Sequence, residues 1–209
     1  MLALTRTSLH LEATPARIDA WRRSFAAAHA LVWPGLLDAD LAAYVRRRLA
    51  VAPVVIRTED AREIEHTIDD PLLLGAMQAI LSDPALWRLV EAVTGCPAID
   101  AFSGRVYRRE ARPGGAHYFP WHSDVTDGRL IGLSVNLSDK PYDGGRLQIR
   151  DAASGRLLTD IATAAFGDAM IFRIDPALEH QVTPVAGATP RTALAGWFRE
   201  GVGYWTLVR

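Results

Sequence analysis

The sequence predicts an α+β protein in which a mainly helical first half supports a β-rich second half. Up to about residue 97, apolar residues recur at helical spacing behind capping residues and prolines. From Ile99 onward, short β-rich runs alternate with Gly, Pro and Asp. The length of 209 residues suffices for one sizeable core. We therefore expect one domain over residues 1–209, with 1–97 as helical support and 98–209 as the β core.

Helix starts in the first half are marked by a side chain that can cap the helix, followed by proline at the first helical position. This pair occurs as Thr14-Pro15, Asp70-Pro71 and Asp83-Pro84. Asp38 is expected to cap a further helix that reaches about Leu49, and Gly95 is placed to end the last helix. Two short strands, Val54–Arg57 and Glu63–Thr67, are predicted between the helices.

The second half contains eight β-rich runs bounded by turn-forming residues. Eight strands suit a double-sheet jelly roll, in which side chains from different strands converge at one mouth, whereas periodicity alone leaves an ordinary β-sandwich open. Gly144-Gly145 is expected to form a turn between strands. The runs are Phe102–Arg108, His117–Asp124, Leu130–Leu137, Arg146–Arg150, Ile161–Ala164, Ala169–Arg173, His180–Val185 and Thr192–Phe198.

Two histidines and one aspartate form the main candidate for a metal site. His122 and Asp124 stand two apart in Trp-His-Ser-Asp, and alternate residues of an extended strand project from the same face. A distant strand would then supply His180 as the third ligand. Two imidazoles and one carboxylate on one side of an ion leave the opposite positions open, which suits non-haem Fe(II) in oxygenases.

Several motifs appear in one order between about Tyr107 and Phe198. They are His122-Ser-Asp124, the Leu133–Leu137 strand, Gly144-Gly145-Arg-Leu, Gly167-Asp-Ala-Met-Ile-Phe, His180-Gln-Val-Thr-Pro-Val and Arg191-Thr-Ala-Leu-Ala-Gly-Trp. Together they resemble the Fe(II)/2-oxoglutarate-dependent dioxygenase superfamily, in its prolyl-4-hydroxylase-like group. The resemblance implies a double-stranded β-helix, a cupin-like jelly roll, braced here by the N-terminal helices.

The resemblance also implies roles for individual residues. His122, Asp124 and His180 would bind the iron, and Arg191 would pair with the distal carboxylate of 2-oxoglutarate. A buried anion needs a hydrogen-bonded cation, and the fixed fork of arginine suits a carboxylate better than lysine does. Three further side chains are candidates for contacts with the co-substrate: Thr192, Tyr107 and, as a competitor of Tyr107, Tyr118.

Asp124 bears on the reaction type, because related halogenating enzymes lack the acidic ligand and use the freed position for chloride. Its presence favours hydroxylation of an unactivated C–H bond, with succinate and CO2 as co-products. The cofactors implied are Fe(II), 2-oxoglutarate and O2, with ascorbate as an optional reductant. Desaturation or ring formation would use the same residues.

Two other classes of function use parts of this pattern. A metal-dependent hydrolase or isomerase on a cupin-like scaffold would bind Zn(II) with the same three ligands and activate water. A non-catalytic jelly-roll binding module would need only the fold. Retention of all three ligands together with Arg191 speaks against the binding module.

Substrate contacts are expected from five polar residues near the predicted mouth, namely Arg105, Arg129, Arg146, Gln148 and Arg150. One or two of these arginines would clamp a carboxylate-bearing substrate, and the small chain favours a small molecule or short peptide. The balance of 23 basic and 24 acidic residues does not call for nucleic acid or a membrane surface. The N-terminus lacks the apolar run of a secretory signal, and Cys96 is the single cysteine, so we expect a cytoplasmic protein.

Overall fold

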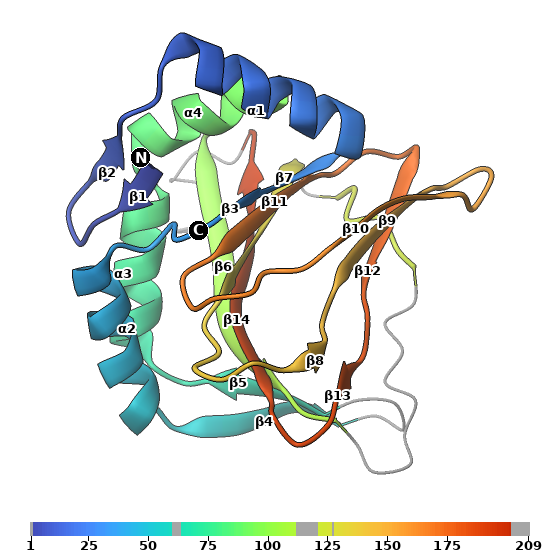
Figure 1. The fold of residues 1–209 in the computed structure, drawn as a ribbon. Coiled ribbons are helices and arrows are strands. Elements are labelled where there is room, and N and C mark those ends of the chain that lie inside the picture. Colours follow the sequence, from blue (N-terminus) through green and yellow to red (C-terminus); the bar gives the residue numbers. More distant parts are fainter. Residues whose placement is uncertain (1, 60–63, 112–120, 127, 202–209) are drawn as a thin grey trace.

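The computed structural model describes residues 2–59, 64–111, 121–126 and 128–201, with only the backbone of 56–59 and 64. Its helices lie on one side of a large sheet, and a smaller sheet faces the other side (Figure 1). The α+β fold is that of a double-stranded β-helix braced by N-terminal helices, as predicted. The helices are α1 (Pro15–Ala28), α2 (Ala39–Val51), α3 (Pro71–Leu81) and α4 (Pro84–Thr94).

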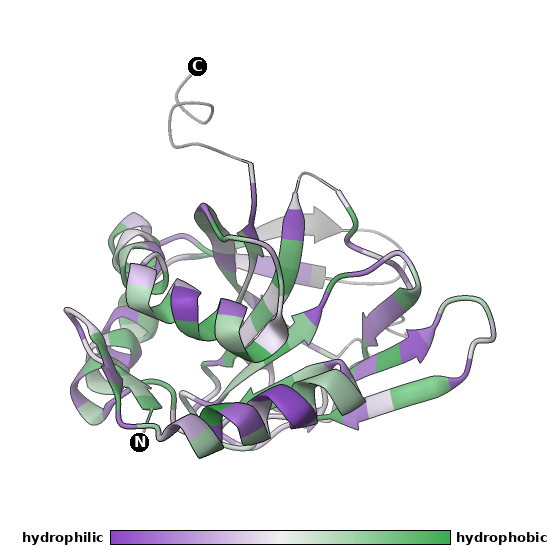
Figure 2. Cartoon of the chain, turned by 90° about the horizontal axis from the view of Figure 1, so that it is seen from above, coloured by the Kyte–Doolittle hydropathy of each residue, from purple (hydrophilic) through white to green (hydrophobic). Residues whose placement is uncertain are grey.

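Each helix begins at the residue that the sequence indicates. The side chains of Thr14, Asp38, Asp70 and Asp83 accept hydrogen bonds from backbone N–H groups in the first turn of the helix that follows. Gly95 ends α4 in the left-handed conformation, with its N–H donating to the Glu91 carbonyl. Figure 2 shows that the helices carry both hydrophilic and hydrophobic residues, as expected where one face packs on a core. None of the helices in the described ranges is long and apolar enough to span a membrane.

The larger sheet contains seven strands in the order β3-β11-β7-β14-β6-β5-β4, and its neighbouring strands pair antiparallel. Its outer face packs with all four helices into the main hydrophobic core. The strands are β3 (Ala30–Trp33), β4 (Val54–Glu59), β5 (Ile64–Ile68), β6 (Ala101–Arg109), β7 (Arg129–Asn136), β11 (Ala169–Arg173) and β14 (Arg191–Arg199).

The smaller sheet has the order β10-β9-β12 and lies across a second hydrophobic cluster from the larger one. Leu147 and Ile149 of β9 meet Met170 and Phe172 of β11 in this cluster. The strands are β9 (Leu147–Asp151), β10 (Leu157–Ile161) and β12 (Leu178–Val182). Two further two-stranded sheets pair β1 (Leu2–Leu4) with β2 (Leu9–Leu11), and β8 (Asp143–Gly144) with β13 (Val185–Ala186).

Some predicted strands differ from the observed ones. The strand predicted over His117–Asp124 is wrong within residues 121–124, which are irregular apart from one isolated bridge between His122 and His180. The strand predicted at Ile161–Ala164 occurs earlier, at Leu157–Ile161, because it pairs with β9 across the Ser154-Gly155 turn. The sequence reading also missed β1, β2, β3, β8 and β13, which have two to four residues each, too short for a period to show.

The centre of the larger sheet depends on two facing glycines. Gly196 of β14 pairs with Gly104 of β6, and the ring of Phe102 lies over both. A Cβ on Gly196 would lie 2.3 Å from the Ser103 carbonyl oxygen and 2.7 Å from the Cα of Gly104. The two strands that carry Arg191 and Tyr107 therefore approach each other as only glycine allows.

We expect Gly196→Ala to lower the free energy of unfolding by about 1–3 kcal/mol, because backbone atoms must move to admit the methyl group. Gly75→Ala in α3 is the matched control, since nothing lies within 4 Å of its added Cβ. This control should raise the free energy of unfolding by about 0.5 kcal/mol through its higher helix propensity. Urea denaturation of both variants measures the difference. Equal midpoints would show that the β14–β6 contact tolerates a side chain.

Candidate active site

A reciprocal backbone pairing brings two histidines together from distant parts of the chain. The His122 N–H donates to the His180 carbonyl at 3.1 Å, and the His180 N–H donates to the His122 carbonyl at 2.9 Å. Their rings stand side by side with centroids 4.5 Å apart. His180 is held in β12, whereas His122 lies in the irregular segment that this bridge fastens to the sheet.

Asp124 completes the cluster two residues beyond His122. Its Oδ2 lies 3.4 Å from Nε2 of His180, and its Oδ1 lies 4.0 Å from Nε2 of His122. One ligand atom from each of the three residues lies within 4.8 Å of the other two. Two imidazole nitrogens and one carboxylate oxygen at this spacing fit a single divalent transition metal, and this donor set suits Fe(II).

Two side chains fix the carboxylate of Asp124 from outside the cluster. Nε1 of Trp197 donates to Oδ2 at 2.8 Å, and Nη1 of Arg129 donates to Oδ1 at 3.1 Å. The Arg129 guanidinium lies 3.8 Å over the Trp197 ring. Burial raises the pKa of the Asp124 carboxyl, but hydrogen bonds from His180 and Trp197 outweigh this effect and hold the pKa at about 2. Asp124 is therefore ionised at neutral pH, as a metal ligand must be.

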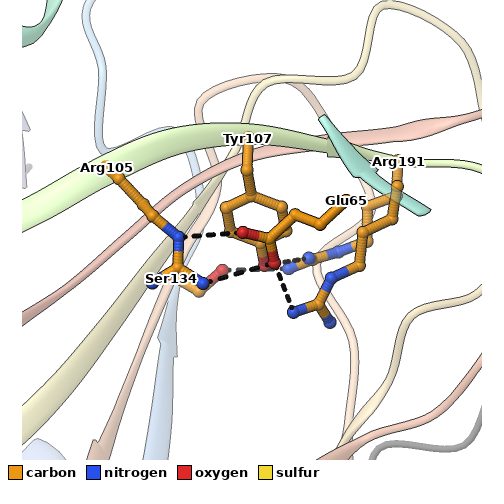
Figure 3. A network of polar contacts seen from close by, with 6 residues as sticks. Glu65, Arg105, Tyr107, Ser134 and Arg191 are labelled. Atoms are coloured by element: carbon orange, nitrogen blue, oxygen red, sulfur yellow. Dashed lines mark hydrogen bonds and ion pairs between the residues drawn. The ribbon is translucent and has the colours of Figure 1, made fainter. Parts of the chain in front are cut away.

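A buried cation lies on the same cavity as this cluster. The Arg191 side chain is 1% exposed, with Nη1 donating to the Tyr107 hydroxyl at 2.6 Å and Nη2 to Oγ of Ser134 at 2.9 Å (Figure 3). Burial lowers the pKa of Arg191, but the phenols of Tyr107 and Tyr142 raise it by more, so the guanidinium stays charged. Among the described residues, its Nε has no hydrogen-bond acceptor and no carboxylate forms an ion pair with the guanidinium.

Such a cation fits an acidic ligand. A buried charge is costly unless it is paired, so Arg191 is poised to receive an anion. The pKa of the neighbouring Tyr107 phenol is lowered. Burial raises this pKa, but the charges of Arg191 and Arg109 lower it by more. Gly145 makes room for the guanidinium, because its φ is +62° and an added Cβ would lie 2.6 Å from Cδ of Arg191.

A second charged group in this region is paired within the protein. Glu65 of β5 accepts from Nε and Nη2 of Arg105 at 3.1 and 3.2 Å, and from Nη2 of Arg109 at 3.3 Å. Burial raises the pKa of Glu65, but Arg105 and Arg109 lower it by more. Glu65 is therefore an ionised, buried partner that ties β5 to β6 beside Tyr107 (Figure 3).

One cavity of about 260 Å³ connects these groups. Apolar side chains from β7, β9, β11 and β12 form part of its wall, including Leu147, Met170 and Phe172. The Phe172 ring lies 4.7 Å from the His180 ring and restricts the orientation of that imidazole. The polar lining comprises His122, Asp124, His180, Arg105, Tyr107, Arg109, Arg129, Ser134 and Arg191.

Most of the residues predicted from the sequence are thus brought together. His122, Asp124, His180, Arg191, Tyr107, Arg105 and Arg129 all line the cavity. Thr192 does not, because it follows Arg191 on the opposite face of β14. Its hydroxyl accepts from Nε of Arg108 at 3.4 Å and lines a separate depression. Tyr118 lies outside the described residues.

Three other expected substrate contacts are not found in the cavity. Arg146, Gln148 and Arg150 alternate with the inward-facing residues of β9 and therefore point outward. Arg146 and Gln148 hydrogen-bond to Asp160, and Arg150 pairs with Glu179. Arg150 also lies 4.5 Å over the Trp121 ring.

The sequence reading missed four cavity or network residues: Glu65, Arg109, Ser134 and Trp197. Trp197 donates a hydrogen bond to Asp124. Alternation along β14 places it on the same face as Arg191, six residues earlier, and that signal was available. Glu65 carries no such signal, because its role depends on the pairing of β5 with β6.

Comparison with known proteins relates the second half of the chain to one superfamily. Residues 106–199 match the sequence profile of the 2OG-Fe(II) oxygenase superfamily. The search against functionally curated proteins gave no match. Among solved structures, an oxidoreductase of the 2OG-Fe(II) oxygenase family from Burkholderia pseudomallei is 16% identical, with a TM-score of 0.67 over 94% of this chain and 97% of that one.

Two further solved structures share the fold. A Pseudomonas putida prolyl-4-hydroxylase is 21% identical, with a TM-score of 0.59 over 88% of this chain and 100% of that one. The epimerase SnoN of nogalamycin biosynthesis is 18% identical, with a TM-score of 0.63 over 89% and 84% of the two chains. The profile match implies Fe(II) and 2-oxoglutarate, and it covers His122, Asp124, His180 and Arg191. Over residues 106–199 this chain is therefore similar in sequence to the 2OG-Fe(II) oxygenase superfamily, and the chain shares the fold of these solved structures.

Proposed function

We propose that this protein is an Fe(II)- and 2-oxoglutarate-dependent oxygenase that hydroxylates an unactivated C–H bond of a small molecule or short peptide and releases succinate and CO2. One observation supports it above the others. The same cavity holds two imidazoles and a carboxylate within 4.8 Å of one another, together with a buried arginine that has no described carboxylate partner. A metal bound by the two imidazoles and the carboxylate, and a dicarboxylate paired with the arginine, would account for both features.

The residues divide into two groups by what they would hold. His122, Asp124 and His180 would hold Fe(II), and Arg191 with Tyr107 and Ser134 would hold the distal carboxylate of 2-oxoglutarate. Bound together, Fe(II) and 2-oxoglutarate supply the O2-dependent oxidising chemistry. Trp197 and Arg129 keep the Asp124 carboxylate in one orientation, in which it would present an oxygen to the metal.

The cavity walls suit this chemistry in two ways. Leu147, Met170 and Phe172 exclude water from one side, which strengthens each ion pair inside the cavity. The volume of about 260 Å³ lies just below the roughly 300–1,000 Å³ of ordinary small-molecule sites. A small molecule or a single side chain of a peptide fits such a space better than a bulky group.

Related activities would use the same residues, and products separate them. One structural neighbour is an epimerase, and inversion of a stereocentre leaves the substrate mass unchanged. Hydroxylation adds one oxygen atom, and 18O2 labels the product. A Zn(II)-dependent hydrolase would form no succinate from 2-oxoglutarate. Succinate release together with an 18O-labelled product is therefore the result that we expect.

Anaerobic addition of Fe(II) and 2-oxoglutarate should produce a visible charge-transfer band, because a 2-oxo acid chelating Fe(II) absorbs in this range. His122→Ala and His180→Ala should each abolish the band, since each removes one of the three ligands. His10→Ala, on a half-exposed histidine of β2, is the control and should retain it. Absence of the band in folded wild-type protein would contradict the proposal.

Arg191→Met should weaken 2-oxoglutarate binding at least about 30-fold, because it leaves the distal carboxylate buried without a cation. Arg173→Met is the control: it removes a partly buried arginine that donates to the Thr94 carbonyl away from the cavity. Calorimetric titration of 2-oxoglutarate into the metal-loaded variants measures the change. Unchanged affinity for 2-oxoglutarate in Arg191→Met would show that Arg191 does not bind the co-substrate, even if the metal site is intact.

Trp197→Phe should lower divalent metal affinity by about 10- to 100-fold, because it removes the N–H that orients Asp124 and keeps the ring under Arg129. Trp87→Phe removes an indole hydrogen bond of similar length, to the Leu81 carbonyl, and should leave metal affinity unchanged. Titration with Co(II), followed by its visible absorption, gives both affinities. An equal affinity in the two variants would show that the Trp197 hydrogen bond does not orient the carboxylate.

A further inference from the structure

Two arginines of the cavity that were predicted to contact substrate use their donors differently. Arg105 presents its Nε and Nη2 edge to Glu65, which fills it with two hydrogen bonds. Arg129 donates from Nη1 to Asp124 and leaves the Nε and Nη2 edge without an acceptor among the described residues. That edge is the side of the guanidinium that binds a carboxylate with two parallel hydrogen bonds.

The charge of Arg129 is balanced by Asp124 in the absence of metal. The two groups are 3.1 Å apart, and the side chains of both are largely buried. When Asp124 binds a divalent ion, its negative charge is shared with that ion, so Arg129 loses most of its counter-charge. A partly buried guanidinium without a counter-charge favours the entry of an anion.

The position of Arg129 determines where in the cavity such an anion would lie. Its guanidinium lies 3.8 Å over the Trp197 ring, and this contact restricts the positions that the unpaired edge can adopt. Asp124, one hydrogen bond away, belongs to the candidate metal cluster. An anionic group held there would lie next to the metal, whereas Arg191 would hold the co-substrate elsewhere in the cavity.

We propose that the substrate of this enzyme carries a carboxylate, and that Arg129 binds it beside the metal site through the Nε and Nη2 edge, which has no acceptor among the described residues. The proposal rests on the proposed function, because the metal is what takes up the negative charge of Asp124 that otherwise balances Arg129. A carboxylate fits better than a neutral amide or alcohol, since it supplies two acceptor oxygens and the missing negative charge. Arg105 then has a structural role in its pair with Glu65.

The test uses the 209-residue chain loaded with Zn(II), which does not react with O2, and saturated with 2-oxoglutarate. N-acetylglycine and N-acetylglycinamide serve as probes that differ in charge and little in shape. Saturation-transfer NMR titrations give their dissociation constants. We expect the acid to bind at least about tenfold more tightly than the amide, and this preference to fall to about one in Arg129→Gln. In metal-free protein Asp124 still neutralises Arg129, so the preference should also disappear.

Two further variants complete the test. Arg146→Gln, on the outer face of the smaller sheet, should keep the full preference for the acid. Arg129→Lys keeps a cation that can reach Asp124 and should retain part of the preference if Arg129→Gln loses zinc. Equal binding of acid and amide to the wild type overturns the proposal. A preference for the acid that survives in Arg129→Gln also overturns it, and would show that the carboxylate binds to the zinc itself. Titration of 2-oxoglutarate is read separately, because its failure to bind would count against the proposed function instead.

Discussion

A single antiparallel bridge between His122 and His180 is the constraint on which the rest of the site depends. The two backbone hydrogen bonds, at 2.9 and 3.1 Å, fasten an irregular segment to the edge of the smaller sheet. Without them, no backbone pairing among the described residues would place His122 opposite β12. With them, the two imidazoles face each other, and Asp124 reaches both from two residues further along.

The hydrogen bonds around Asp124 join the bridge to the larger sheet. Trp197 comes from β14 and Arg129 from the start of β7, so the carboxylate is held by neighbouring strands of one sheet, while His180 belongs to the other. The three candidate metal ligands are therefore held by contacts with both sheets of the jelly roll. Arg191 lies on β14 too, six residues before Trp197 and on the same face, so one strand would position both the proposed co-substrate site and the candidate metal site.

The sequence predicted the candidate metal site better than the segment that holds it. His122, Asp124 and His180 could be found because their residue types and order are distinctive, yet the regular strand expected at His122 is an isolated bridge. The bridge joins residues that are far apart in the sequence, so no local sequence pattern predicts it. The same limit hid Glu65, whose partners Arg105 and Arg109 are more than 35 residues away in the chain.

Other errors had a local signal that was not used. Arg146, Gln148 and Arg150 alternate with Leu147 and Ile149, so the burial of the apolar pair already turns the polar residues outward. Thr192 is excluded by the same rule once Arg191 faces inward. Helix starts were predicted well because the capping side chain and the proline act within one turn, at Thr14, Asp70 and Asp83.

The arginines in this region differ in whether a carboxylate of the protein fills their hydrogen-bonding edge. Arg105 has its bidentate edge filled by Glu65, and Arg150 is paired with Glu179, so both are accounted for within the protein. Arg191 is buried against two hydroxyl groups that carry no full charge, and Arg129 has one edge without an acceptor. Folding does not recover the cost of burying a cation with neutral partners, so this cost must be offset when an anion binds. This argument applies to Arg191, whereas Arg129 is paired with Asp124 and would need a second anion only if a metal took up the charge of that carboxylate.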